Sequence, residues 1–165
     1  MLILAHAFSV PPLHAVFVNF TAGLIPTAFV FDLLAAIFKK DSLRAAAWWT
    51  LLLAAIITPL TAAAGWWWLL AEPEEHAGHW QMPIHQWLGT AAAVLLIPIA
   101  VWRGRLYKNG THPGWAYAFV AVVFLAALCV QGDLGGSMSF GEGIVIKHGA
   151  EQTSAPAATA PAHSH

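Results

Sequence analysis

Four long apolar segments alternate with short polar segments along this chain. They cover residues 13–38, 45–71, 84–102 and 115–131. A helix needs about 17–25 predominantly apolar residues to cross the hydrocarbon core of a bilayer, and each segment reaches that length. The pattern predicts an all-α integral membrane protein, in which four transmembrane helices form an up-down bundle.

The composition supports this assignment. The chain is 59% hydrophobic and 9% charged, whereas soluble domains carry about 25% charged residues. Such a deficit indicates that lipid covers much of the surface. Pro26, Pro59 and Pro98 lie inside apolar segments, where we expect kinks rather than breaks because neighbouring helices can satisfy the freed carbonyl groups.

The basic residues predict the orientation. Six of the 7 lie between the first and second segments or between the third and fourth: Lys39, Lys40, Arg44, Arg103, Arg105 and Lys108. Short loops rich in Lys and Arg stay cytoplasmic, so both termini are expected on the outer side. The net charge of -1 gives no attraction to nucleic acid.

The last helix is followed by two segments of unusual composition. Residues 132–149 are glycine-rich, which predicts a short hairpin or a lid over the outer end of the bundle. Residues 150–165 are rich in Ala, Pro, Ser and Thr, which predicts a disordered tail. We therefore expect one transmembrane domain over residues 1–149, and the sequence shows no convincing internal repeat.

Two histidines lie at matched depth in this scheme. His14 is at the outer start of the first helix and His85 at the outer start of the third. These helices run parallel and diagonally opposite, roughly 11–14 Å apart if neighbouring axes are about 8–10 Å apart. Two inward-facing imidazoles can then share a metal, such as haem iron with the porphyrin between the helices. Alternatively, both are interfacial histidines that bond to carbonyl groups.

Small residues beside the two histidines would leave room for a flat macrocycle: Ala15, Ala22, Gly23 and Gly89.

A second set of metal-binding residue types lies in the loop EPEEHAGHWQMP. It comprises His76, His79 and Met82, which Met138 and the tail residues His163 and His165 could extend. Imidazole and thioether groups suit copper outside the cytoplasm. The alternative is a solvated loop with incidental histidines.

Other polar residues allow two interpretations. Asp32 in the first helix is a functional candidate because ionisable groups are rare in membrane helices, but it is also close enough to the cytoplasmic interface to pair with Arg44 or Arg103. Asn19 and Asp133 can form interhelical hydrogen bonds or line a polar pocket at the outer end, and so can Thr21, Thr58, Thr61 and Gln131.

Motifs of soluble enzymes are absent. The sequence contains no phosphate-binding loop, dinucleotide fingerprint, HExxH or Gly-x-Ser-x-Gly element. This indicates an electron carrier or a subunit rather than a stand-alone enzyme.

Several motifs in order resemble one bacterial membrane family. They are Pro12-Leu13-His14-Ala15-Val16-Phe17-Val18-Asn19-Phe20, Phe31-Asp32-Leu33-Leu34, His85-Gln86-Trp87-Leu88-Gly89 and Gly132-Asp133-Leu134-Gly135-Gly136-Ser137-Met138. The family is catalogued as domain of unknown function 2231. The resemblance covers residues 11–146 and implies four helices with a haem or metal role, carrying over His14 and His85.

The sequence departs from the family pattern at three positions. Ala15 stands where the family has proline, and Asn19 and Glu142 stand where it has histidines.

These observations lead to one functional expectation and two alternatives. The expectation is a membrane b-type haem protein for electron transfer at the outer face of the bacterial inner membrane, with periplasmic termini. His14 and His85 are its axial ligands, and a quinol, another haem subunit or a periplasmic electron carrier is its redox partner. The alternatives are a non-catalytic anchor or subunit of a respiratory complex and a periplasmic-side copper-handling protein.

Overall fold

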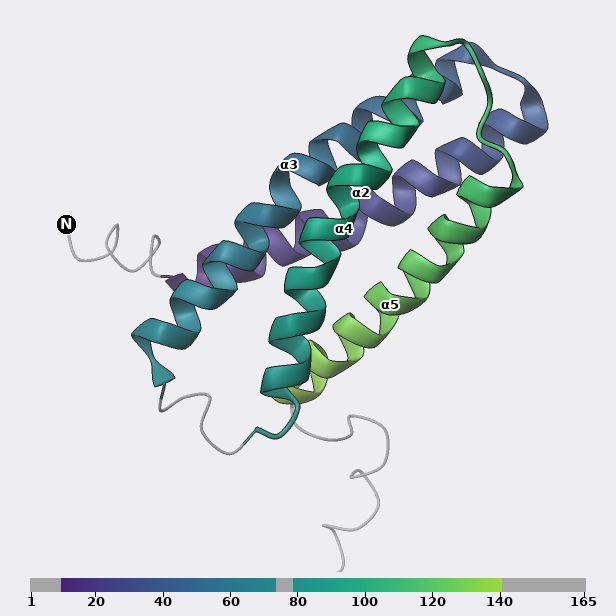
Figure 1. Cartoon of the computed structure of the whole chain (residues 1–165). Coiled ribbons are helices and arrows are strands. Elements are labelled where there is room, and N and C mark those ends of the chain that lie inside the picture. Colours follow the sequence, from purple (N-terminus) through teal and green to yellow (C-terminus); the bar gives the residue numbers. More distant parts are fainter. Residues whose placement is uncertain (1–9, 74–78, 141–165) are drawn as a thin grey trace, which may run out of the picture.

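The computed structural model describes residues 10–73 and 79–140, and this part of the chain is built from four long helices (Figure 1). They are α2 (Val10–Phe38), α3 (Asp41–Ala71), α4 (Met82–Lys108) and α5 (Trp115–Phe140). Each helix contains a stretch long and apolar enough to cross a membrane, between 25 and 31 residues in length. The all-α architecture of four spanning helices is therefore confirmed.

Three helices continue through an internal proline, at Pro26, Pro59 and Pro98. The main difference from expectation lies in α5, which continues to Phe140. Residues 132–140 are thus helical rather than a hairpin or lid. In lipid, each backbone polar group needs an internal partner, and helix continuation supplies it even across glycines. The rest of the predicted lid and the predicted tail lie outside the described residues.

The helices form a ring in which each packs against its neighbours in sequence, and α5 closes the ring against α2. Consequently α2 and α4 are diagonally opposite and run in the same direction, as expected. The starts of α2 and α4 and the ends of α3 and α5 lie together at one end of the bundle (Figure 1). We call this the histidine end, because it carries His14 and His85, and the opposite one the arginine end.

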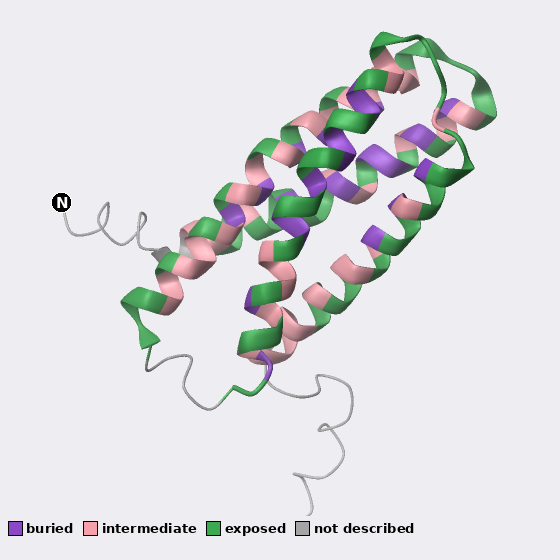
Figure 2. Cartoon of the chain, viewed as in Figure 1, coloured by how far each residue is buried: buried purple, intermediate pink, exposed green. Residues whose placement is uncertain are grey.

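Buried and exposed positions alternate along each helix (Figure 2), and the exposed positions include many large apolar residues. The core is made of residues of moderate size from all four helices, including Ile25, Leu51, Leu96 and Phe124. The outer faces expose large aliphatic side chains, which is the arrangement expected where lipid is the solvent. Helix α5 is the least buried, with 11% of its spanning window inside the bundle against 33% for α2.

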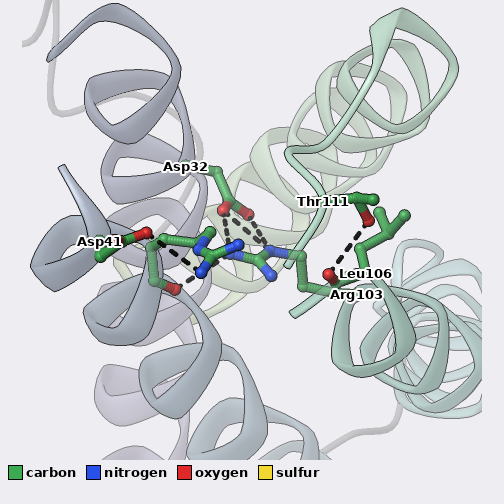
Figure 3. Close-up of polar contacts among 6 residues, drawn as sticks. Asp32, Asp41, Arg103, Leu106 and Thr111 are labelled. Carbon is green, nitrogen blue, oxygen red and sulfur yellow. Dashed lines mark hydrogen bonds and ion pairs between the residues drawn. The ribbon is translucent and has the colours of Figure 1, made fainter. Parts of the chain in front are cut away.

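A buried ion pair closes the arginine end (Figure 3). Arg103 is 0% exposed, and its Nε donates to both carboxylate oxygens of Asp32 at 2.8 and 3.0 Å. Its Nη2 lies 2.7 Å from Oδ1 of Asp32 and donates to the backbone oxygen of Arg44 at 3.0 Å. Because α4 extends to Lys108, Arg103 lies inside a helix rather than in a loop, and it joins α4 diagonally to α2.

Aromatic packing fills the same end. The indole of Trp48 from α3 stacks on Tyr107 of α4, with ring centroids 6.1 Å apart. A Cβ at Gly104 would lie 2.7 Å from the indole, so glycine is needed for this contact. The guanidinium of Arg44 lies 5.7 Å from the centroid of the Tyr107 ring, close enough for a cation–π interaction.

Candidate functional site

The imidazole of His14 lies against the backbone of α3. Its Nδ1 is 3.2 Å from the carbonyl oxygen of Thr61. A carbonyl only accepts, so Nδ1 carries the proton and donates it. One turn further along α3, a Cβ at Gly65 would lie 3.0 Å from Cε1 of this ring and 3.3 Å from Nδ1. The absence of a side chain at Gly65 therefore opens the Thr61 carbonyl to the imidazole.

The imidazole of His85 lies against α5 in the same way. Its Nδ1 is 3.2 Å from the carbonyl oxygen of Gln131. A Cβ at Gly135 would lie 2.8 Å from its Cε1. Again the carbonyl is reached because the residue one turn later is glycine.

The two arrangements repeat each other along the chain. His14 and Thr61 are 47 positions apart, and His85 and Gln131 are 46 apart. Each hairpin, α2–α3 and α4–α5, thus holds one histidine by one carbonyl followed by a glycine. The two hairpins therefore share this one contact, although the sequence itself shows no convincing internal repeat.

Both imidazoles line one cavity of about 620 Å³ at the histidine end. All four helices contribute to its wall: Ala15, Val18 and Asn19 from α2, Gly65 and Trp68 from α3, Gln86 from α4, and Gly132, Gly135, Gly136 and Ser139 from α5. Pockets for small molecules and cofactors typically have volumes of about 300–1,000 Å³. The cavity is therefore large enough for a ligand of that class.

A smaller chamber of about 80 Å³ is lined by the same two histidines and by residues deeper in the bundle. Four threonine hydroxyl groups line its wall beside two histidines and two glutamines. The Oγ1 atoms of Thr21 and Thr61 are 2.8 Å apart, which confirms the interhelical hydrogen bond expected between these helices. Thr58 instead donates to the carbonyl of Ala54 in its own helix, and Thr90 accepts from the indole of Trp66 at 2.9 Å.

Part of the copper set reaches the same cavity. His79, Met82 and Met138 line the large cavity together with both imidazoles. His76 and the tail histidines His163 and His165 lie outside the described residues. No group of three or more His, Cys, Asp or Glu side chains suited to a metal occurs within residues 10–73 and 79–140. The candidate metal ligands along the described cavity are therefore imidazoles, from His14, His85 and His79, and the thioethers of Met82 and Met138.

Comparison with known proteins adds one finding. A family model described as "Predicted membrane protein (DUF2231)" matches residues 10–148. The chain belongs to the DUF2231 family. No curated protein and no solved structure matches the chain. The predicted family is confirmed, and its description supports a membrane protein without assigning an activity.

The structure places the three polar candidates of this DUF2231 protein in different surroundings. Asn19 lines the large cavity. Asp133 is exposed and lines neither cavity. Asp32 lines neither cavity, and both oxygens of its carboxylate accept hydrogen bonds from Arg103 at the arginine end. The ion-pair interpretation of Asp32 is the one that the structure supports.

Sequence reasoning identified the two histidines of the DUF2231 chain but missed the residues that orient them. Gly65 and Gly135 are inconspicuous among 13 glycines. The available signal was the similar spacing from each histidine to a glycine in the following helix, 51 positions from His14 to Gly65 and 50 from His85 to Gly135. Gln131 was recognised as polar, but its contact with a histidine could not be inferred from its position.

Proposed function

We propose that this protein is a membrane b-type haem protein that transfers electrons at the outer face of the bacterial inner membrane. His14 and His85 serve as the axial ligands. The termini are periplasmic, so the histidine end faces the periplasm, as the distribution of basic residues indicates. A quinol or another haem subunit supplies electrons, and a periplasmic carrier accepts them.

The observation that carries this proposal is the tautomer shared by the two imidazoles. Each Nδ1 donates to a backbone carbonyl, so in the neutral ring the lone pair is at Nε2. Histidines that bind metals typically donate their other ring N–H to a carbonyl or carboxylate, which fixes the ring and raises its basicity. Both rings meet this requirement and line a common cavity.

The cavity wall also suits a flat, largely apolar group. Ala15, Gly132 and Gly136 leave space beside the rings, and a Cβ at Gly136 would meet nothing within 4 Å. Haem supplies the one-electron redox chemistry, while the bundle sets ligand geometry, burial and dielectric. A single site near one face serves only half of the bilayer, so a membrane partner must complete the path.

Visible absorption spectra of the detergent-purified protein test this proposal. The oxidised and dithionite-reduced wild type is compared with His14→Ala, His85→Ala and the control His112→Ala. His112 is exposed in the loop at the arginine end. We expect a sharp reduced α-band in the wild type and in the control, and its loss or change in both site variants.

A colourless wild type under adequate haem supply would overturn the proposal. The anchor or subunit alternative then becomes the hypothesis to test, by co-purification of a partner.

One observation favours a second candidate, copper handling. His79, Met82 and Met138 line the cavity that contains the two imidazoles, and thioether and imidazole ligands together suit Cu(I). Copper content per chain decides this candidate, measured for the wild type and for a Met82→Leu/Met138→Leu variant. If the wild type contains copper and shows no Soret band, and the variant loses the copper, copper handling becomes the function supported in place of haem binding.

A further inference from the structure

Gln131 contacts both ring nitrogens of His85. Its backbone oxygen lies 3.2 Å from Nδ1 and its side-chain Nε2 lies 3.3 Å from the ring Nε2. One residue of α5 therefore engages the whole polar edge of an imidazole on α4. The second contact involves the nitrogen that a metal would need.

The two contacts require the same protonation state. A carbonyl oxygen only accepts, so Nδ1 of His85 must donate to it. An amide nitrogen only donates, so Nε2 of His85 must accept from Gln131. Both conditions are met by the neutral ring with its proton on Nδ1, and the side-chain bond uses the Nε2 lone pair.

The amide of Gln131 lies in a place shaped to receive it. A Cβ at Gly89, one turn after His85, would lie 2.8 Å from Nε2 of Gln131, so glycine leaves the space that the amide fills. The amide oxygen Oε1 is buried and has no hydrogen-bond partner within the described residues. An unsatisfied buried acceptor weakens the hold on this position and favours departure of the amide when a competitor arrives.

The residue that holds His14 in the other hairpin uses its side chain differently. Thr61, whose carbonyl holds His14, uses its hydroxyl to bond Thr21 at 2.8 Å and the carbonyl of Ile57 at 3.1 Å. The Thr61 side chain thus makes both of these bonds beside the smaller chamber. Gln131 therefore differs from Thr61 in that its side chain, as well as its backbone oxygen, contacts the histidine.

We propose that Gln131 is a releasable cap that competes with a metal for Nε2 of His85. The inference rests on the proposed function and adds its regulation: His85 becomes a ligand only after the amide swings away, while the backbone oxygen of Gln131 keeps the ring oriented. Gln131 is thus a positioning residue that acts on the rate and affinity of cofactor capture.

The first test is the rate of hemin binding to cofactor-free protein in detergent, followed by stopped-flow absorption. Gln131→Leu removes the donor, and we expect capture about threefold to tenfold faster, the range that one hydrogen bond of ordinary strength provides. Gln131→Glu retains the size but offers only acceptors, which favours a proton on Nε2 and slows capture. Asp133→Asn is the matched control, because Asp133 lies two residues from Gln131 on α5, is exposed and lines neither cavity; its rate should equal that of the wild type.

A merely structural role would change the rate in the same direction in both Gln131 variants, and that result would overturn the cap. So would equal rates in Gln131→Leu and the wild type.

The second test needs no haem. Nitrogen-15 spectra of histidine-labelled, cofactor-free protein report the state of each ring nitrogen. We expect an unprotonated, hydrogen-bonded Nε2 at His85 in the wild type, loss of that bond in Gln131→Leu and a protonated Nε2 in Gln131→Glu.

An unchanged His85 signal in Gln131→Leu would overturn the cap whatever the outcome with haem. If the wild type binds no hemin while the His85 signal changes as expected, the contact stands and the haem function falls.

Discussion

The two ends of the bundle handle buried polar groups in opposite ways. At the arginine end, Arg103 and Asp32 form a buried ion pair at 2.7 Å, and Trp48 stacks on Tyr107 at the same end of the bundle. At the histidine end, two imidazoles are held by backbone carbonyls beside a cavity of about 620 Å³. The same four helices thus form a buried ion pair at one end of the bundle and a cavity at the other.

The difference shows how to interpret a polar residue in a membrane helix. Asp32 is an obvious functional candidate by its chemistry, yet Arg103 occupies both of its oxygens. His14 and His85 are weaker candidates one at a time, yet each donates its Nδ1 proton to a backbone carbonyl and lines the cavity. A polar group paired with an opposite charge inside the bundle stabilises the fold, whereas an oriented group beside a cavity can bind a ligand.

Removing one partner of the ion pair should have the largest effect on stability. Arg103→Met leaves the carboxylate of Asp32 buried without its cation, and breaking a buried pair in this way costs about 3–5 kcal/mol. We expect a marked fall in the thermal or denaturant midpoint of the detergent-solubilised protein.

The double variant Asp32→Leu/Arg103→Met is the control, because well-packed apolar groups can replace a buried pair at little net cost. Recovery of most of the stability in the double variant would show that the loss in Arg103→Met comes from the unpaired carboxylate of Asp32. A midpoint in Arg103→Met equal to that of the wild type would show that the pair contributes nothing.

The same small change at each end should separate packing from ligand binding. Gly135→Ala brings a Cβ to 2.8 Å from the His85 ring, and Gly104→Ala brings one to 2.7 Å from the Trp48 indole. Overpacking costs about 1–3 kcal/mol, offset by about 1 kcal/mol of helix propensity. We expect both variants to lose stability, but only Gly135→Ala to lose haem or metal affinity.

Gly23→Ala serves as the control for this pair, since its Cβ would meet nothing within 4 Å and Gly23 lines neither cavity. It should fold at least as well as the wild type and bind equally. Equal loss of binding in the Gly104 and Gly135 variants would mean that the ends are not independent.

The smallest effect is expected between the two ends. Thr21→Val removes the 2.8 Å hydrogen bond to Thr61, and such bonds between membrane helices contribute about 0.6 kcal/mol on average. Chemical denaturation of the wild type and the variant should show a loss of that size. A loss as large as that of Arg103→Met would show that the threonine contact stabilises the bundle as much as the ion pair does.

Much of the fold could be predicted from the sequence because lipid imposes a simple rule. Long apolar segments must become helices to satisfy their backbone groups, and this rule located all four. The rule also holds beyond Gly132, where the glycine-rich composition suggested a lid. There α5 continues as a helix to Phe140. Arg103 was likewise expected between two helices, because the apolar segment ends at Trp102, whereas α4 continues to Lys108.

The site was predictable only in part, for a geometric reason. Helix direction and depth were enough to pair His14 with His85 across the bundle. The contacts that orient the rings depend on helix rotation, which decides whether the carbonyls of Thr61 and Gln131 face a histidine. Periodicity does not determine rotation when apolar residues surround a helix on all sides.

The sequence by itself determined the number of helices, their direction and the end at which the histidines gather, because these follow from hydrophobic length and the order of segments. Only the tertiary structure decided that Asp32 is neutralised by Arg103, that glycines open two carbonyls to the imidazoles, and that Gln131 caps one of them. Those features depend on distances of about 3 Å between residues far apart in the chain, and side-chain packing alone sets such distances.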